Sequence, residues 1–543
     1  MLKLSLEPLD NQANPAFKDA ASCARWLSQF QLTDVTLAHA TLLTQLYQLN
    51  RMPLPSDIRW EILEKLSDTI FLVQADYSKK LLGKKLPLLE KEFTTLISSV
   101  MLWQQMSIGY QRCLQAQLDG EKQLNVVEVC ERCLRYNQLQ IFEYLQACYE
   151  VDAVLWQQLH ALYYFTEELG IQAQEIRDDH SLQGINKKPI KRNISCQTTY
   201  IQTLLMNRAC PHELSRKKFQ LLEHWLMQWC HDMTLYFNVA TGHGDAPPLA
   251  VDLAGTQGLQ AVQKGAQNSQ QRYLAMVSIS KLIRAKTILL QQGQSPQQVG
   301  LGEVPSDVNC VEFLNYLHQC WCENINNVET PTQSDIAHET QACYGLEEIY
   351  TYLANKPFRL KSKGIDMDVI SRKRIAMFGS TQLISDTPTT NFGQPLEAYE
   401  IEEESPLGVK LLRKSLAGVR LTRNQIIALR SSTSGIFKVG VIKSAQVTYT
   451  GQLAISVRHL PGLAQAVTLD SKSPRTPGTK PPAAAILFPA LTEVGIPASL
   501  LIPRDWFQPG LELEITNQDN NKFIVRLGLS AEKGLDFERV NFT

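Results

Sequence analysis

The stretch YEIEEESPLGVKLLRK, residues 399–414, brings carboxylates, a turn and basic side chains together within a short length of chain. Tyr399 and Ile401 alternate with polar residues, which is typical of a strand. The Ser-Pro-Leu-Gly segment at 405–408 supplies turn residues, and a second apolar run then ends in basic residues. Two structures account for this pattern: a solvent-facing hairpin in a small sheet, or a nucleotide-binding turn.

Two pairs of closely spaced cysteines are candidates for metal or redox chemistry. Cys130 and Cys133 form a Cys-x-x-Cys motif, but it lies within the helical pattern NVVEVCERCLRYNQL, and no second pair follows at zinc-finger spacing. Cys320 and Cys322 also lack a partner pair. Because cysteine behaves as a small hydrophobic residue beside bulky apolar neighbours, we expect these cysteines to be structural.

Two loops carry residues that suit cation binding or proton transfer. Glu175, Asp178, Asp179 and His180 crowd into EIRDDHSLQG, where they either bind a cation or close a helix and solvate a loop. His243, in the sequence GHGD, could act as a general base. The motifs GxSxG, HExxH, Walker A and GxGxxG are absent. A hydrolase or metalloenzyme would need both loops to converge on one pocket, so we expect no enzyme.

The elements that carry these residues differ between the two ends of the chain. Positions 1 to about 355 have the spacing of amphipathic helices. One helix is predicted to start at Ser56 and Asp57, after Pro55. Another places six bulky residues on one stripe: Leu222, Trp225, Leu226, Trp229, Cys230 and Met233. His224 and His231 lie on that helix and are expected to pack or to line its rim. The pattern predicts seven or more long antiparallel helices.

After residue 396 the period of the apolar pattern becomes two. Residues 356–396 read as a basic, flexible linker. Beyond it, Leu453, Ile455 and Val457 alternate with polar residues, and turn signals such as SSTSG and NQDNN separate short runs. These runs predict an antiparallel barrel or sandwich, which the Pro-rich loop at 471–482 would split into two sub-sheets. The predicted class is α+β multidomain: an all-α domain over 1–355, the linker, and a β-barrel domain over 397–543.

The composition is that of a globular protein with more than one domain. The chain has 543 residues, 44% of them hydrophobic and 20% charged, and a net charge of −1. No global field would therefore attract it to nucleic acid or to anionic membranes. We find neither the run of roughly 18 apolar residues that a membrane helix needs nor the apolar core of a signal peptide. Twelve cysteines suit a reducing compartment, which predicts a cytoplasmic protein.

The turn motif Glu403-x-Ser405-x-x-Gly408 resembles the (Asp/Asn)-x-Ser-x-x-Gly motif of PilZ domains, small antiparallel β-barrels that bind the bacterial second messenger cyclic di-GMP. The runs IFKVGVIKSAQ and QLAISVRHL downstream are also similar to strands of such a barrel. A long helical region containing LSLEPLDNQANP and LNRMPLPSDIRWEILEKL, joined to this barrel, resembles PilZ-type proteins of proteobacteria. The resemblance implies a PilZ-like barrel and cyclic di-GMP as its ligand.

The same resemblance implies which residues bind the ligand. In the family, an upstream Arg-x-x-x-Arg binds guanine and phosphate, the acidic or amide residue and the serine contact a base edge, and the glycine allows close approach. This chain has no Arg-x-x-x-Arg; Arg372 and Arg374 are the nearest upstream substitutes, and a second basic group follows the turn. Four neighbouring glutamates would repel a dianion unless cations neutralise them. The expected ligand-binding residues are Arg372, Arg374, Glu403, Ser405, Gly408 and Arg413.

Two functions compete at this point. In the first, the protein is a signalling protein that binds cyclic di-GMP, needs no cofactor or metal, and conveys occupancy to its helical domain or to a protein partner. In the alternative, the barrel has lost its ligand and the protein is an adaptor that acts through protein–protein contacts. The glutamates would then form an acidic strand edge that discourages aggregation, with Ser405 capping the turn and Gly408 supplying the bend.

Overall fold

The computed structural model describes residues 2–121, 123–178, 192–239, 246–262, 268–323, 339–358, 395–431, 435–470 and 481–543. The chain forms two compact units. The first comprises Met1–Lys84, Leu88–Ser334 and Gln446–Tyr449, and the second comprises Lys85–Pro87, Asp335–Ala445 and Thr450–Thr543. Lys85–Pro87 thus belongs to the second unit although the chain on both sides of it builds the first. Gln446–Tyr449 belongs to the first unit although the chain on both sides of it builds the second.

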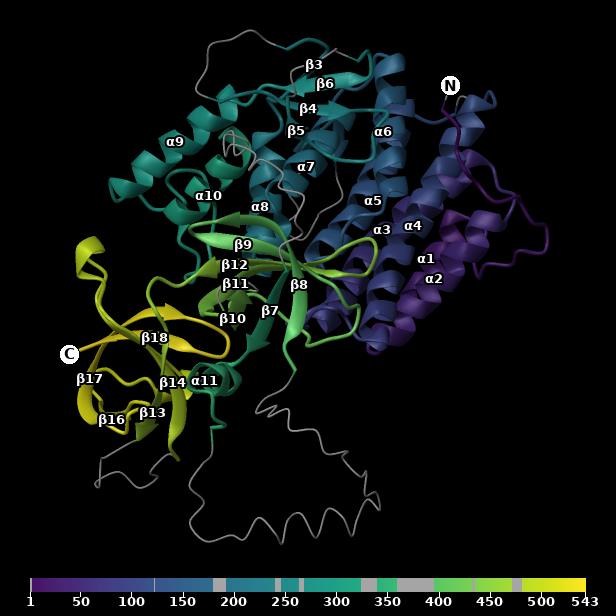
Figure 1. Cartoon of the computed structure of the whole chain (residues 1–543). Helices are drawn as coiled ribbons and strands as arrows, with labels where there is room; N and C mark the ends of the chain where they lie inside the picture. Colours follow the sequence, from purple (N-terminus) through teal and green to yellow (C-terminus); the bar gives the residue numbers. More distant parts are fainter. Residues whose placement is uncertain are drawn as a thin grey trace, which may run out of the picture. The chain divides into compact units, whose positions relative to one another are not determined.

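The first unit is built mainly from helices, many of which form a bundle of long neighbouring rods (Figure 1). They are α1 (Ala20–Ser28), α2 (Val35–Arg51), α3 (Ser56–Tyr77), α4 (Glu90–Leu118), α5 (Val126–Gln146), α6 (Ala153–Glu168), α7 (Cys196–Arg208), α8 (Arg216–Trp229), α9 (Val277–Gln291) and α10 (Cys310–Cys322). A short 3-10 helix, η1 (Ser78–Leu81), continues α3, and another, η2 (Pro211–Glu213), precedes α8. The prediction of seven or more helices is confirmed.

Local sequence signals explain where these helices begin. Asp34 caps α2, Asn125 caps α5 and Ser215 caps α8, each through a side-chain oxygen that accepts a hydrogen bond from a backbone N–H of the first turn. Helix α3 starts directly after Pro55, as predicted. The predicted apolar stripe of α8 is buried along its whole length. Its burial joins α8 to the core of the bundle, which runs through all ten helices.

The first unit also contains short strands, although an all-α domain was predicted for 1–355. They are β1 (Ile176–Asp178), β2 (Arg192–Ile194), β3 (Leu235–Tyr236), β4 (Leu249–Asp252), β5 (Gln260–Ala261) and β6 (Gln271–Leu274). β1 pairs with β2, and the other four form a sheet in the order β3-β6-β4-β5. Strands of two to four residues are too short to leave a recognisable alternation in sequence.

The second unit contains two closed antiparallel barrels, which confirms the β-barrel prediction for the C-terminal region. The first barrel has the strand order β10-β11-β12-β9-β8-β7. Its strands are β7 (Glu339–Tyr344), β8 (Glu397–Ser405), β9 (Gly408–Arg413), β10 (Ile426–Ser431), β11 (Phe437–Val447) and β12 (Leu453–His459). The barrel thus takes its first strand and the following helix, α11 (Leu346–Ala354), from residues before the predicted boundary at 355. Of the predicted linker, 359–394 lies outside the described residues.

The second barrel follows directly and has the strand order β13-β14-β15-β18-β17-β16. Its strands are β13 (Gln465–Asp470), β14 (Ala483–Phe488), β15 (Ser499–Ile502), β16 (Glu512–Thr516), β17 (Lys522–Lys533) and β18 (Glu538–Phe542). Helix α11 packs against β7 and β10 of the first barrel and against β13 and β14 of the second. One buried cluster includes residues of both barrels and of this helix, so the two barrels share a core.

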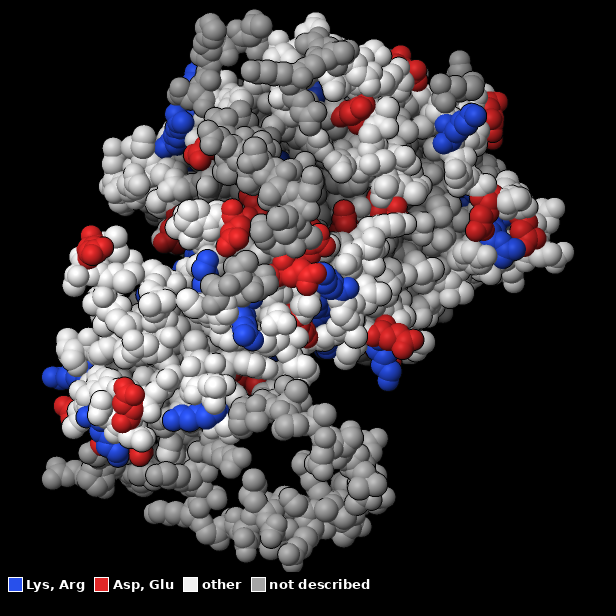
Figure 2. All heavy atoms as spheres, in the orientation of Figure 1, with Lys and Arg blue, Asp and Glu red and all other residues white. Residues whose placement is uncertain are grey.

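Charge is distributed without a dominant sign. On the face drawn in Figure 2, basic and acidic side chains are interspersed, in keeping with the net charge of −1. Because neither sign of charge dominates, an anion site on this protein must be a local arrangement of side chains.

Among the described residues, no helix combines the length and the apolar character that a bilayer crossing requires.

Candidate functional site

The predicted turn is the tip of the hairpin between β8 and β9. The hydroxyl oxygen of Ser405 accepts a hydrogen bond from the Gly408 N–H at 3.2 Å, and the Ser405 hydroxyl donates to the Gly408 carbonyl at 3.0 Å. Between them, the side chain of Leu407 is 80% exposed. Of the two structures predicted for this stretch, the geometry is that of the solvent-facing hairpin, and Ser405 closes its turn.

The glutamates of β8 have cationic neighbours within the same barrel. Glu403 forms an ion pair with Lys410, and Glu404 lies 3.7 Å from the ammonium of Lys438. β8 pairs with β7 on one side and with β9 on the other, so it is not a free strand edge. The acidic run is therefore an exposed, partly neutralised face of a closed barrel.

Gly408 is required by the packing of β9 against β12. A Cβ atom at Gly408 would collide with the backbone carbonyl oxygen of Val457, which lies on the neighbouring strand. The resemblance implied that this glycine lets a ligand approach the backbone. In the structure, the backbone of β12 makes that close approach.

We predict that Gly408→Ala destabilises the first barrel by about 1–3 kcal/mol, because the added methyl group must push β9 and β12 apart. Leu407→Ala, at the exposed tip, should change stability by less than about 0.5 kcal/mol. Hydrogen–deuterium exchange of peptides from 397–459 measures both effects. Unchanged exchange in Gly408→Ala would show that the strands separate without cost.

Arg413, the last predicted ligand-binding residue in this region, is buried in the first barrel with a side chain that is 1% exposed. It donates to the carbonyl oxygens of Ser415 at 3.0 Å, Val419 at 2.9 Å and Leu416 at 3.2 Å, and it lies 3.8 Å from Glu397. These bonds hold the loop after β9 in place. The guanidinium therefore stabilises the barrel in this conformation.

Arg372 and Arg374, the predicted clamp, lie outside the described residues. Of the downstream basic group, Lys414 forms an ion pair with Glu339, and Arg420 donates to the carbonyl oxygens of Lys85 and Pro87. The structure thus brings Glu403, Ser405 and Gly408 together at one hairpin, with Arg413 at the far end of β9.

The cysteines singled out above are buried in helices. Cys130 and Cys133 lie on α5, and burial raises the pKa of the Cys130 thiol to about 12 and that of Cys133 well above its usual range. Cys320 and Cys322 lie on α10 and are also buried. A thiol held in its neutral form is a poor nucleophile and a poor metal ligand, so these cysteines act as packing residues.

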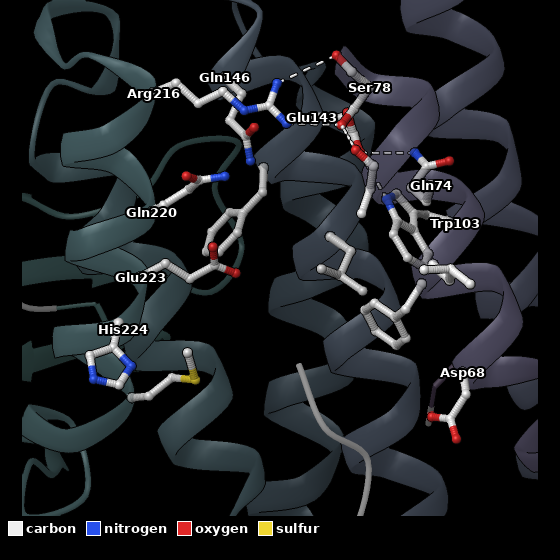
Figure 3. Close-up of a pocket in the computed structure, with 16 residues that line it drawn as sticks. Asp68, Gln74, Ser78, Trp103, Glu143, Gln146, Arg216, Gln220, Glu223 and His224 are labelled. Carbon is white, nitrogen blue, oxygen red and sulfur yellow. Dashed lines mark hydrogen bonds between the residues drawn. The ribbon is translucent and has the colours of Figure 1, made fainter. Parts of the chain in front are cut away.

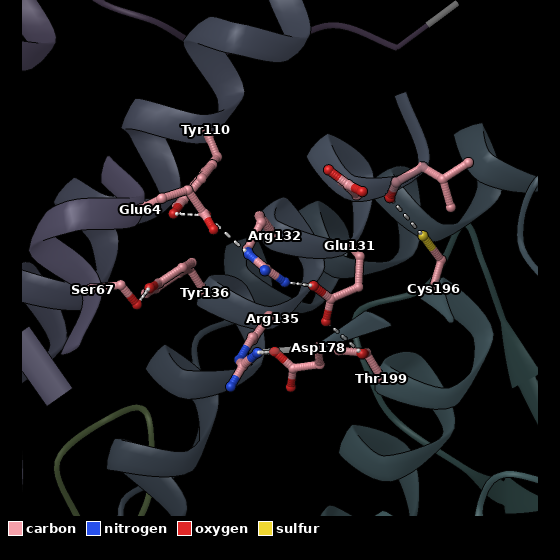
Figure 4. A network of polar contacts seen from close by, with 12 residues as sticks. Glu64, Ser67, Tyr110, Glu131, Arg132, Arg135, Tyr136, Asp178, Cys196 and Thr199 are labelled. Carbon is pink, nitrogen blue, oxygen red and sulfur yellow. Dashed lines mark hydrogen bonds and ion pairs between the residues drawn. The ribbon is translucent and has the colours of Figure 1, made fainter. Parts of the chain in front are cut away.

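Asp178 takes part in a buried network of charges rather than in a surface loop (Figure 4). Its carboxylate accepts a hydrogen bond from Arg135 of α5 at 2.9 Å. One turn away on α5, Arg132 binds Glu131 at 2.6 Å and Glu64 of α3 at 3.2 Å. The network ties β1 and α3 to α5. Asp179, His180 and His243 lie outside the described residues.

A cavity of about 400 Å³ opens within the helical unit, between α3, α4, α5 and α8 (Figure 3). Phe71, Trp103 and Phe142 contribute aromatic rings to it. The polar residues that line it are Asp68, Gln74, Ser78, Glu143, Gln146, Arg216, Gln220, Glu223 and His224. A cavity of this volume, with apolar walls and a few convergent polar groups, is typical of a small-molecule site.

Arg216 crosses one end of the cavity. Its guanidinium reaches from the first turn of α8 to Ser78, where it donates to the hydroxyl oxygen at 3.1 Å and to the carbonyl oxygen at 3.4 Å (Figure 3). Burial lowers the pKa of Arg216, while the charges of Glu143 and Glu223 oppose that shift. The side chain thus remains a cation beside two carboxylates.

Glu143 lies deeper, on α5. Its carboxylate accepts hydrogen bonds from Gln74 at 2.9 Å and from the indole N–H of Trp103 at 3.0 Å. The pKa of Glu143 is raised, because the effect of burial exceeds the opposing effects of the two hydrogen bonds and of the charge of Arg216. The cavity therefore combines a guanidinium, carboxylates, amides and aromatic rings, which together can bind a planar heterocycle that carries both donors and acceptors.

Sequence reasoning did not find this cavity, apart from placing His224 at a helix rim. Arg216, Gln220 and Glu223 lie at i, i+4 and i+7 on α8, beside the apolar stripe. Helices α3 and α5 also contribute polar residues to the lining. The available signal was therefore a polar face on each of these three helices, but such faces usually meet solvent.

Comparison with known proteins gives two matching domain families. Residues 21–240 match the N-terminal domain described as "Cyclic-di-GMP receptor FimW", and residues 472–543 match the "FimW C-terminal beta-barrel domain". The chain resembles FimW at both ends. The cyclic-di-GMP receptor FimW of Pseudomonas aeruginosa is 19% identical to this chain over 551 residues, which cover 94% of this chain and 88% of that protein. No solved structure gives a significant match.

The two candidate sites differ in whether they lie within the ranges that match FimW. All residues that line the helical cavity, from Asp68 to Met227, lie within the range that matches the FimW N-terminal domain. The hairpin residues Glu403, Ser405 and Gly408 lie outside both domain matches. The similarity supports a family of cyclic di-GMP receptors, but it does not by itself show a PilZ domain.

Proposed function

We propose that this protein is a cyclic di-GMP receptor. The observation that carries the proposal is the similarity to FimW, which covers both the helical region and the second barrel. The chemistry of the helical cavity agrees with it, because cyclic di-GMP offers two guanines and two phosphates to guanidinium, carboxylate and aromatic groups.

The adaptor alternative has no comparable support, since the similarity is to a named receptor. The protein acts as a cytoplasmic, non-enzymatic receptor without a cofactor, which passes occupancy on to a protein partner. The predicted clamp of Arg372 and Arg374 around the β8–β9 hairpin remains a prediction for where the ligand binds.

Two short segments, Lys85–Pro87 and Gln446–Tyr449, offer a route by which ligand occupancy is passed from the helices to the barrel. Lys85–Pro87 follows η1 closely and belongs to the second unit, where the backbone of Leu86 pairs with Leu421 of the first barrel. Gln446–Tyr449 belongs to the first unit, where Val447 pairs with Tyr149, just after α5. Movement of η1 or of the end of α5 would therefore be passed along the chain into the barrel.

Isothermal titration of the full chain with cyclic di-GMP tests the proposal. We expect saturable binding with a Kd on the order of micromolar or tighter, no binding of GTP, and recovery of the ligand intact after incubation. At a ligand concentration of about 100 Kd, binding should stabilise the fold by about 2.7 kcal/mol and raise the melting temperature. No heat and no thermal shift at that excess would contradict the receptor function.

A further inference from the structure

We propose that the cavity between α3, α4, α5 and α8 binds one guanine of cyclic di-GMP, with Arg216 on the base edge that carries O6 and N7. This inference rests on the proposed function and assigns the ligand to the helical unit instead of the β8–β9 hairpin. Three features of the described residues support it: the position of Arg216, the acceptors on the same face of α8, and the aromatic lining.

Arg216 is placed to read guanine. Its guanidinium spans the cavity end and binds Ser78 through two different nitrogens. The carbonyl and hydroxyl oxygens of Ser78 are a pair of acceptors, as are O6 and N7 of guanine. A base that enters the cavity can therefore exchange places with Ser78 and keep both hydrogen bonds of the guanidinium satisfied.

Glu223 supplies the complementary acceptor. It lies two turns after Arg216 on the same face of α8, about 10 Å further along the helix axis. This spacing leaves room for the width of a purine between the two long side chains. The carboxylate can accept from the N1–H and the exocyclic amino group of guanine, while Gln220 lies between them at the cavity mouth (Figure 3).

The walls favour a flat aromatic ligand. Trp103 and Phe142 are buried, and Phe71 is partly buried beside them. Stacking of a base on aromatic side chains contributes to binding in a sequence-independent way, so the guanidinium and the carboxylate provide the discrimination. A volume of about 400 Å³ accommodates one guanosine half of the dinucleotide, and the second half would extend past the exposed mouth residues Gln146 and Gln220.

This arrangement predicts discrimination against adenine. Adenine presents an amino group where guanine has O6, and a donor there would face the donors of Arg216. Cyclic di-AMP should therefore bind at least about tenfold more weakly than cyclic di-GMP. Equal affinity for the two dinucleotides would overturn the assignment of Arg216 to the base.

The decisive experiment compares variants of the full chain by isothermal titration. Arg216→Lys keeps the charge but loses the two-pronged guanidinium, and we expect it to weaken cyclic di-GMP binding about 10- to 100-fold. Glu223→Gln should weaken it about tenfold. The matched control is Lys217→Ala, in the same turn of α8, where Lys217 is exposed and pairs only with the exposed Asp307 among the described contacts. It should keep the wild-type affinity.

The outcomes separate the site from the function. If wild type binds cyclic di-GMP, and Arg216→Lys binds equally well while Ser405→Ala does not, the site lies at the hairpin and this inference fails, although the receptor function stands. If wild type binds no cyclic di-GMP, both fail. Melting temperatures of all variants verify folding, and wild-type affinity in both Arg216→Lys and Arg216→Ala overturns the inference even if one of them is less stable.

Discussion

Replacing Arg413 with alanine should lower the free energy of unfolding of the first barrel by about 2–5 kcal/mol. The side chain is 1% exposed, and its removal leaves the carbonyl oxygens of Ser415, Leu416 and Val419 without their donor. It also removes a cation that lies 3.8 Å from the Glu397 carboxylate on β8. Because the variant loses three hydrogen bonds and an ion pair made by a buried guanidinium, the loop after β9 should open and expose the barrel.

Hydrogen–deuterium exchange of peptides from 397–421 measures this effect. Lys414→Ala is the control, because Lys414 is the next residue and its ion pair with Glu339 is exposed, so exchange should change little. The experiment also tests the ligand role first predicted for Arg413. A variant with native exchange but lost cyclic di-GMP binding would show that Arg413 contacts the ligand, contrary to its structural role here.

The second large effect is expected in the helical unit, where Arg135→Ala should destabilise the fold by about 3–5 kcal/mol. The side chains of Arg135 and Asp178 are 4% and 1% exposed, and their ion pair joins α5 to β1. Removing the arginine takes one cationic partner away from the buried carboxylate of Asp178. The β1–β2 hairpin should then detach from α5.

Chemical unfolding followed by tryptophan fluorescence measures this change, because every tryptophan except Trp506 lies in the first unit. The double variant Arg135→Met/Asp178→Leu is the informative control. It replaces both charges with apolar side chains of similar length and should recover most of the lost stability. A single variant within about 1 kcal/mol of wild type would contradict the stabilising role assigned to the Arg135–Asp178 ion pair.

Much of the architecture is determined by local patterns in the sequence. The change from a helical period to a period of two near residue 396 predicted the helical region and the barrels, since each period places apolar side chains on one face of its element. The starts of α3 and α8 follow from residues beside them, because caps and Pro55 act within one turn. The cyclic di-GMP family was also indicated by sequence resemblance.

Only the tertiary structure decided what the charged residues do. Arg413 and Arg216 are both arginines next to apolar runs, yet packing buries the first among three carbonyl groups and places the second at the end of a cavity. Glu143 and Glu223 come from different helices and are eighty residues apart in sequence. Periodicity reports which face of one element is polar, but a cavity exists only where the faces of several elements meet, and that depends on contacts between residues far apart in the chain.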